Sequence, residues 1–418
     1  MRRHPLAAAL LVALRVGTVD AEDWPQFRGP AGPGHSSERH LPLEWSEARN
    51  VVWKTPVPGR GWSSPVVAGG RVWVTTAVRG RDGASLRVLS YDADTGREGV
   101  NVELFRLRDA ALLNPKNSHA SPTPILDGDR VYVHFGAEGT AAITTAGEIV
   151  WKTRIPFTNQ HGGGGSPVLY EDLLIFNCDG WDAAFVVALD ARTGKQRWKT
   201  NRRYPADQAY TTPLVIRVGD QDQLVSVGAY RAAAYEPRSG REIWRVTYRD
   251  GFSNVPRPVY GQGLVFLATG FQQPSLLAVR ADGTGDVTRT HTAWTQQRAA
   301  PYTPSPLLVD DLLYTVSDIG IAAALDARTG VPVWIQRLGG NYSASPVFAD
   351  GRIYFQSEEG VTTVIAPGRE FCVLARNQLD GEMLASMAVS GGSIFIRTDS
   401  ALYRIGTPPI KQVSAAVR

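Results

Sequence analysis

Polar and aromatic side chains that are capable of chemistry recur in the loops of this 418-residue chain, between short apolar runs. They offer aromatic faces, amides, carboxylates and guanidinium groups, a set that could hold a polar small molecule, a sugar or a peptide segment. The candidate ligand-binding residues are Arg60, Trp62, His119, His161, Asp179, Trp181, Asp182, Tyr230, Arg231, Asn254, Tyr302, Asp318, Tyr342, Glu358 and Glu359. A carbohydrate in particular could stack on Trp62, Trp181, Tyr302 and Tyr342.

Two histidines and a glycine run invite specific interpretations. His119 and His161 occupy equivalent places in neighbouring repeats and could share a metal ion, but the spacing places no third ligand. Hydrogen bonds to the loop backbone are the alternative, and we predict no metal site. The run Gly162–Gly165 could cradle a phosphate, or it could permit close approach of the backbone beside a channel.

The acidic candidates also have two interpretations. Carboxylates at loop tips could bind calcium or act as a general acid and base, or they could be solvated and paired with arginine. They are Asp179, Asp182, Asp318, Glu358 and Glu359. Arg60 and Arg231 could clamp a carboxylate ligand or pair with these acids. The segment Asp282–Asp286 resembles a calcium turn, although a plain hairpin loop is the favoured interpretation.

An internal repeat predicts how these loops are positioned. A three-residue anchor of Ser or Thr, Pro and an aliphatic residue recurs about every 40 to 48 residues after a longer first spacing. The copies begin at Ser64, Thr123, Ser166, Thr212, Arg257, Ser305 and Ser345, with a degenerate eighth at Met387. A short turn and then an aromatic or β-branched run follow each anchor, a pattern that is typical of β-hairpins.

A second element repeats with the same period. Asp190 and Trp198 are separated by Thr193-Gly194, and Asp326 and Trp334 by Thr329-Gly330. Between Glu236 and Trp244 the same place is taken by Ser239-Gly240. The Thr-Gly pair indicates a tight turn, after which the Trp returns on an outer strand and packs between neighbouring sheets. The predicted docking tryptophans are Trp53, Trp151, Trp198, Trp244, Trp294 and Trp334.

Together the two elements predict an all-β, eight-bladed β-propeller of four-stranded antiparallel blades. Residues 50–55 resemble an outer strand and precede the first anchor, so we expect them to complete the last blade, which ends near Ile405. Pairing of the two chain ends removes an open sheet edge. The predicted organisation is a signal peptide at 1–21, an irregular arm at 22–49, the propeller at 50–406 and a tail at 407–418.

The amino-terminal composition predicts export. Arg2 and Arg3 precede the apolar stretch Leu6–Leu14, and Val19 and Ala21 fit a cleavage site. Cys178 and Cys372 are the two cysteines, so a lipid-modified cysteine near the cleavage site is excluded and two free, buried thiols are expected. The net charge of +4 arises from 44 basic and 40 acidic residues without like-charged runs, which argues against a nucleic-acid partner.

Residues 188–198, which read Ala-Leu-Asp-Ala-Arg-Thr-Gly-Lys-Gln-Arg-Trp, resemble the tryptophan-docking repeat of quinoprotein dehydrogenases and of the outer-membrane assembly propeller. The segments 24–30, 177–180 and 251–258 resemble pyrroloquinoline-quinone-binding-like repeat proteins. The likeness spans about residues 50–405. It implies that pyrroloquinoline quinone with calcium is a possible cofactor. However, the adjacent cysteines of the dehydrogenases are missing, and their calcium ligands find no matching motif.

The resulting prediction is an exported, non-catalytic scaffold in the periplasm or outside the cell. Its channel mouth would bind a periplasmic protein or a small polar ligand such as a carbohydrate. A quinone-dependent oxidoreductase with a divergent cofactor site is the alternative.

Overall fold

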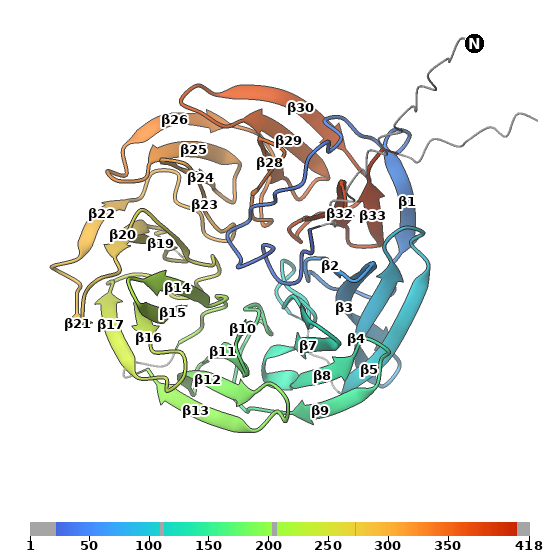
Figure 1. The fold of residues 1–418 in the computed structure, drawn as a ribbon, viewed down its shortest axis with the longest axis horizontal. Helices are drawn as coiled ribbons and strands as arrows, with labels where there is room; N and C mark the ends of the chain where they lie inside the picture. Colours follow the sequence, from blue (N-terminus) through green and yellow to red (C-terminus); the bar gives the residue numbers. More distant parts are fainter. Residues whose placement is uncertain (1–21, 109–112, 203–206, 272, 408–418) are drawn as a thin grey trace, which may run out of the picture.

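The computed structural model describes residues 22–108, 113–202, 207–271 and 273–407, which form a closed ring of eight β-sheets (Figure 1). The predicted signal peptide and most of the predicted tail lie outside these residues. The prediction of an eight-bladed propeller is confirmed. Within the described residues, no helix is long or apolar enough to cross a membrane.

The blades are numbered along the chain from their innermost strand outward. Blade 1 holds β2 (Val66–Ala68), β3 (Arg71–Gly80), β4 (Gly83–Asp92) and β5 (Glu98–Leu107); blade 2 holds β6 (Ile125–Asp127), β7 (Arg130–His134), β8 (Thr140–Thr144) and β9 (Ile149–Thr153). Blade 3 holds β10 (Val168–Tyr170), β11 (Leu173–Asp179), β12 (Ala184–Asp190) and β13 (Gln196–Asn201); blade 4 holds β14 (Leu214–Val218), β15 (Gln221–Gly228), β16 (Arg231–Tyr235) and β17 (Glu242–Thr247), with β21 (Gly285–Asp286) at its edge.

The remaining blades follow the same order. Blade 5 holds β18 (Val259–Gly261), β19 (Leu264–Ala268), β20 (Leu276–Arg280) and β22 (Thr292–Gln296); blade 6 holds β23 (Leu307–Val309), β24 (Leu312–Val316), β25 (Ile321–Asp326) and β26 (Pro332–Arg337). Blade 7 holds β27 (Val347–Ala349), β28 (Arg352–Gln356), β29 (Val361–Ala366) and β30 (Cys372–Gln378); blade 8 holds β31 (Ala388–Ser390), β32 (Ser393–Arg397), β33 (Ala401–Ile405) and β1 (Val51–Pro56). A short 3-10 helix, η1, covers Gly136–Glu138.

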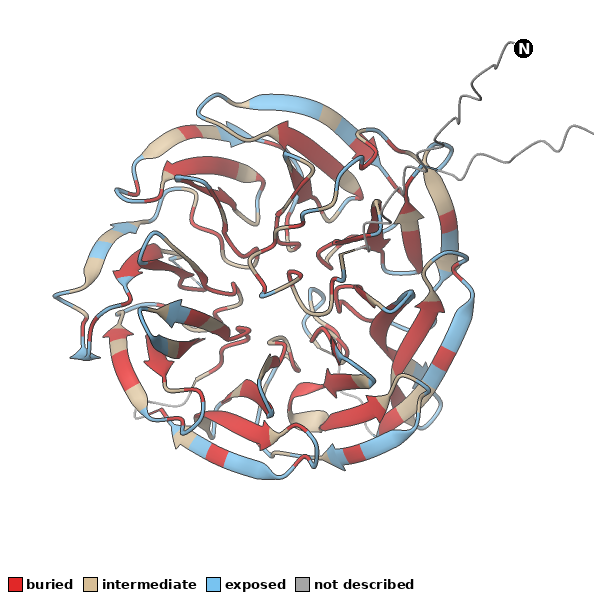
Figure 2. Ribbon diagram, viewed as in Figure 1, coloured by how far each residue is buried: buried red, intermediate tan, exposed pale blue. Residues whose placement is uncertain are grey.

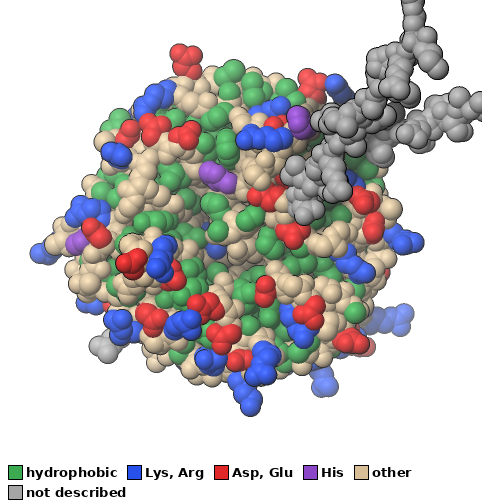
Figure 3. All heavy atoms as spheres, viewed as in Figure 1, with side chains coloured by type: hydrophobic (Ala, Val, Ile, Leu, Met, Phe, Trp, Pro, Cys, Tyr) green, Lys and Arg blue, Asp and Glu red, His purple; other side chains and the backbone are tan. Residues whose placement is uncertain are grey.

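Burial decreases from the middle of each blade to its rim (Figure 2). All residues of β19 and β24 are buried, because both faces of a middle strand pack against neighbouring blades. The outer strand β22 has no buried residue. Position on an outer strand also corrects the expectation of two buried thiols: Cys178 in β11 is buried, whereas Cys372 in β30 is exposed. Charged side chains of both signs are interspersed over the face seen in Figure 3, as the small net charge leads one to expect.

The ring is closed by pairing of the two ends of the propeller. Strand β1 runs antiparallel to β33, with Lys54 opposite Tyr403 and Thr55 opposite Leu402. The long first spacing of the repeat has a plain cause as well, because β3, β4 and β5 of blade 1 have ten residues each. The two closing strands lie side by side in Figure 1.

Tryptophans of the outer strands connect one blade to the next. The indole Nε1 of each donates to a backbone carbonyl in the following blade at 2.9 to 3.1 Å. The pairs are Trp53 with Ala93, Trp151 with Ala191, Trp198 with Pro237, Trp294 with Ala327 and Trp334 with Gly368. The glycine of the Thr-Gly turn lies against the ring: a Cβ on Gly194 would lie 2.5 Å from Trp151. The turn motif therefore serves both backbone geometry and ring packing.

Trp244 departs from this rule. It donates at 2.8 Å to Gln223 Oε1 of its own blade, and Gln223 Nε2 donates at 3.2 Å to the carbonyl of Ala281 in blade 5. Here β21 runs parallel to β17, with Gly285 opposite Trp244. The segment Asp282–Asp286 is thus more than the plain hairpin loop that we expected, because it crosses to blade 4 and adds an edge strand.

The arm formed by residues 22–49 closes one end of the central channel. Trp24 and Val67 exchange backbone hydrogen bonds of 2.7 and 2.8 Å, and the Leu126 amide donates to Pro25 at 2.8 Å. On the opposite side of the ring, the Phe348 amide donates to Gly34 at 2.8 Å. These contacts satisfy backbone groups at the inner edges of blades 1, 2 and 7. The other face of the ring carries the loops that precede each innermost strand, such as the one with Trp62, and those between the second and third strands of a blade, such as the one with Ile319. We call it the loop face.

Candidate functional site

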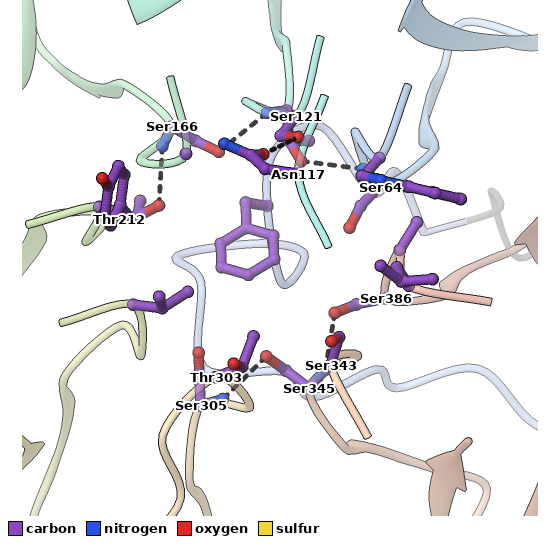
Figure 4. A pocket seen from close by; sticks show the side chains of 18 of the residues that line it. Ser64, Asn117, Ser121, Ser166, Thr212, Thr303, Ser305, Ser343, Ser345 and Ser386 are labelled. Atoms are coloured by element: carbon purple, nitrogen blue, oxygen red, sulfur yellow. Dashed lines mark hydrogen bonds between the residues drawn. The ribbon is translucent and has the colours of Figure 1, made fainter. Parts of the chain in front are cut away.

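A cavity of about 120 Å³ lies in the channel above the arm (Figure 4). Phe27 of the arm contributes to its lining from below, and Trp62, Asn117 and Tyr210 line it near the loop face. Hydroxyl groups from seven blades surround it. They belong to Ser64, Thr123, Ser166, Thr212, Ser305, Ser345 and Ser386, which we call the hydroxyl ring.

The hydroxyl ring is built by hydrogen bonds between successive blades. The Ser64 amide donates to Thr123 Oγ1 at 3.0 Å, and the Thr123 amide donates to Ser166 Oγ at 2.9 Å. The same contact links Ser166 to Thr212, Ser305 to Ser345 and Ser345 to Ser386. In blade 5 Arg257 replaces the hydroxyl residue, and its amide still donates to Ser305 Oγ at 3.0 Å. The contact therefore fixes one hydroxyl at the channel wall in each blade except blade 5.

A second cavity of about 140 Å³ adjoins the first, with which it shares Lys116, Asn117 and Tyr210. His161 and Tyr302 complete its polar and aromatic wall. The His161 and Tyr210 ring centroids are 6.2 Å apart. Of the predicted residues, Trp62, His161 and Tyr302 therefore line these cavities. His119 is half-buried and lines neither of them.

Most predicted acids at the loop face hold the loops in place. Asp182 accepts the Thr158 amide at 2.6 Å, and this bond lowers the pKa of Asp182. Asp318 accepts the amides of Tyr302 and Thr303 at 2.9 and 3.1 Å.

Glu359 likewise accepts the Asn341 amide at 3.0 Å. Glu358 differs, because it accepts Lys116 Nζ at 2.9 Å and Ser343 Oγ at 2.6 Å, both from cavity-lining residues. Arg60 joins Glu358 and Glu359 in an open groove of about 660 Å³ and lies over the Trp62 ring.

Four predicted residues lie away from the channel mouth. Asp179 is buried in an ion pair with Arg202, and burial raises its pKa to about 6 although Arg202 opposes the shift. Arg231 turns back along its blade to pair with Glu242 in a lateral groove. Asn254 is fully buried and donates to the Gly228 carbonyl at 2.7 Å, and Tyr342 is 1% exposed within the core. Asn254 and Tyr342 do lie in the loops where the sequence predicts them, whereas Asp179 and Arg231 are the end residues of strands β11 and β16. In all four, the direction of the side chain takes it away from the channel mouth.

The loop face carries an aromatic ridge across blades 4 to 6. It consists of Tyr230, Phe252, Phe271 and Tyr302, whose successive ring centroids lie 6.1, 5.6 and 5.9 Å apart. Phe271 is 47% exposed. Tyr230 is anchored by a 2.8 Å hydrogen bond from its hydroxyl to Asp207. Trp181 in blade 3 and Ile319 in blade 6 are also exposed on this face, at 56% and 61%.

Lys116, Phe27 and the hydroxyl ring were not among the predicted site residues. The signal for the ring was present, since a Ser or Thr precedes the proline in most anchors. By itself the pattern predicts only the start of a strand and not that the hydroxyl faces the channel. Phe27 gave no such signal, because its place in the channel depends on how the arm docks.

Comparisons with known proteins agree with the geometry. The family model described as outer membrane protein assembly factor BamB matches residues 44–178 and 182–407. No curated protein sequence matches the chain.

Three solved structures illustrate the likeness of fold. BamB from Moraxella catarrhalis is 13% identical with a TM-score of 0.62, over 85% of this chain and 97% of its own. The quinohemoprotein alcohol dehydrogenase from Comamonas testosteroni is 10% identical with a TM-score of 0.66, over 95% and 82%. A europium-containing methanol dehydrogenase is 11% identical with a TM-score of 0.68, over 91% and 90%. At these identities the likeness concerns the fold alone.

Proposed function

Since this chain belongs to the family described as outer membrane protein assembly factor BamB, we propose that it is an exported, non-catalytic scaffold that binds a protein partner through its loop face. The observation that carries this proposal is the aromatic ridge, with Trp181 and Ile319 exposed on the same face. Large exposed apolar side chains that gather on one face mark interaction sites on soluble proteins. Aromatic residues are also enriched in protein interfaces.

The anchoring of the loops supports the same proposal. Asp182, Asp318 and Glu359 each accept backbone amides of neighbouring loops, so the face is held in shape before a partner arrives. A preorganised surface loses little conformational entropy on binding. The carboxylates that could have served as acids, bases or metal ligands are largely committed to this structural task.

The residues present do not fit pyrroloquinoline quinone with calcium. The channel cavities hold about 120 and 140 Å³, whereas small-molecule sites generally span about 300 to 1,000 Å³. Across the ranges that the structure describes, no three His, Cys, Asp or Glu side chains are grouped so that they could hold a metal ion. These observations favour the scaffold over the quinone-dependent oxidoreductase, and we derive no reaction through that cofactor.

Photo-crosslinking tests the scaffold proposal with a matched control. A photoreactive phenylalanine replaces either Ile319 on the loop face or Val331 on the opposite face, which are 61% and 60% exposed. After irradiation in the producing cells, we expect a discrete protein adduct from position 319 that is absent from position 331. Equal adducts at both positions, or none at 319, would contradict the proposal.

A second measurement addresses catalysis directly. The purified protein is titrated with pyrroloquinoline quinone and calcium, and reduction of an artificial electron acceptor is followed with alcohols and sugars. We expect neither saturable quinone binding nor turnover. Turnover that depends on both additions would establish the oxidoreductase instead.

A further inference from the structure

Three arginines beside the central channel are buried, and none of them has an acidic partner among the residues that the structure describes. Arg28, Arg257 and Arg397 are each 1% exposed. Arg28 donates to the carbonyls of Pro33 and Pro306 at 2.8 Å, and Arg257 donates to those of Phe27 and Pro213 at 2.8 and 3.1 Å. Arg397 donates to the Thr75 carbonyl and to Ser63 Oγ at 2.7 and 2.8 Å.

Other buried arginines show that this pattern is not general in the fold. Arg202 and Arg231, which lie between blades, are paired with Asp179 and Glu242. In the part of the chain that the structure describes, none of the three channel arginines forms an ion pair with a carboxylate. The buried positive charge is therefore concentrated around the channel.

Buried charges without counter-ions are costly. Burial lowers the pKa of Arg28 to about 9, with repulsion from Arg257 as a second cause, and burial alone lowers that of Arg257 to about 10. Backbone carbonyl oxygens accept hydrogen bonds from these guanidinium groups, but they carry no net negative charge to balance the positive one. An anion in the channel would supply it.

The cavity next to these arginines is lined by hydroxyl-bearing side chains together with apolar ones such as Phe27, Val255 and Leu384. Phe27, whose carbonyl accepts from Arg257, belongs to the cavity lining, and so does Ser64, the neighbour of Ser63. Among the described residues no Asp or Glu lines the cavity, and its charged lining residue, Lys116, is paired with Glu358, which lies outside the lining. An anion there would meet no opposing carboxylate in the lining.

The hydroxyl ring provides the hydrogen bonds. Its seven hydroxyls belong to residues that are at most 4% exposed, and within the described ranges none of them donates to a protein acceptor. Six accept a backbone amide from a neighbouring blade, and Ser64 Oγ has no hydrogen-bond partner at all among the described residues. Each O–H is consequently available to a ligand in the cavity (Figure 4).

We propose that the channel cavity binds a tetrahedral oxyanion of the phosphate or sulfate class, free or as the head of a larger molecule. Donors that surround a cavity suit an acceptor with oxygens in every direction better than they suit a planar carboxylate. A volume of about 120 Å³ admits such a group. The proposal goes beyond the proposed function, because it assigns a ligand to the channel and does not depend on a partner at the loop face.

Equilibrium dialysis of the purified protein with radiolabelled inorganic phosphate or sulfate tests the proposal, at constant chloride concentration. Saturable binding of one anion per chain is expected. Ser64→Ala removes one donor without breaking an internal hydrogen bond, and we expect binding to weaken about tenfold, as for a hydrogen bond to a charged group. Ser390→Ala, which removes a buried hydroxyl outside the cavity, is the matched control and should bind like the wild type.

A variant that adds a negative charge keeps the test decisive. Ser64→Asp places a carboxylate in the cavity and should abolish anion binding while the chain remains folded by circular dichroism. Competition by glycerol 3-phosphate distinguishes a phosphorylated headgroup from the free anion. Absence of saturable binding by the wild type, or equal binding by wild type and Ser64→Ala, would overturn the proposal.

The two proposals fail independently. Crosslinking at position 319 reports the loop face and does not require an anion in the channel. Dialysis reports the channel and requires no partner protein. A crosslinked partner without anion binding would overturn only the proposal of an anion site. Anion binding without a crosslinked partner would overturn only the proposal of a scaffold.

Discussion

A single buried side chain, His134, links the stability of the propeller to pH. It is 3% exposed, its Nδ1 lies 2.8 Å from Thr140 Oγ1, and its ring centroid lies 4.3 Å from that of Phe176. Burial lowers the pKa of His134 from 6.5 to about 3. Between these values the unfolded chain binds a proton that the folded chain does not bind, so stability is lost as the pH falls.

This linkage should be visible in the free energy of unfolding of the protein. Between pH 7.5 and pH 5, His134 should remove about 2 kcal/mol of stability. Urea titrations of the wild type and of His134→Gln at both pH values measure this contribution. The variant, although less stable at pH 7.5, should lose about 2 kcal/mol less on acidification. Equal losses in the two proteins would show that His134 does not carry the effect.

At the scale of one structural element, the Thr-Gly turn couples backbone conformation to the packing of the next tryptophan. Gly194 has a φ of +70°, and a Cβ there would meet the Trp151 ring of the preceding blade at 2.5 Å. Gly219 has a φ of +55° in another turn, and a Cβ there would meet nothing within 4 Å. Both glycines have a positive φ, so an alanine at either position would be strained. Only the alanine at position 194 would also clash with a neighbouring side chain.

Alanine substitutions at these two positions separate the causes. Gly219→Ala should cost about 1 kcal/mol from the left-handed backbone alone. Gly194→Ala should cost about 3 kcal/mol, because the ring of Trp151 must also move. Chemical unfolding followed by tryptophan fluorescence measures both. Similar costs for the two variants would mean that the ring adapts freely and that the turn motif serves backbone geometry alone.

At the scale of the whole molecule, β1 determines whether the ring has an open edge. Without it, β33 would present unpaired backbone groups to solvent. A chain that begins at residue 57 lacks β1, and one that begins at residue 41 lacks most of the arm but keeps β1. The shorter chain should self-associate, whereas the longer one should stay monomeric.

Light scattering coupled to gel filtration compares the two truncated chains with a chain that begins at residue 22. The chain from residue 41 controls for loss of the arm in the channel. Association of both truncated chains would assign the effect to the arm, and a monomeric chain from residue 57 would show that blade 8 does not need its outer strand.

The candidate site was only partly predictable from the sequence. Trp62, His161 and Tyr302 do line the channel cavities, because loop position alone brings them to the mouth. Asn254 and Tyr342 belong to equivalent loops but are buried inside the structure. A loop assignment gives the place of the backbone, whereas the direction of a side chain depends on contacts with other loops.

The repeated anchors and turns were sufficient to predict eight blades and their closure by residues 50–55. Each blade is a local meander whose strands, turns and docking tryptophan are encoded within about 45 residues, so a periodic pattern reveals it. The hydroxyl ring, the three channel arginines and the arm beneath them emerged only in three dimensions. Their contacts join residues up to several hundred positions apart, as Arg28 does with Pro306 and Pro346, and no local pattern records which distant blade a side chain will meet.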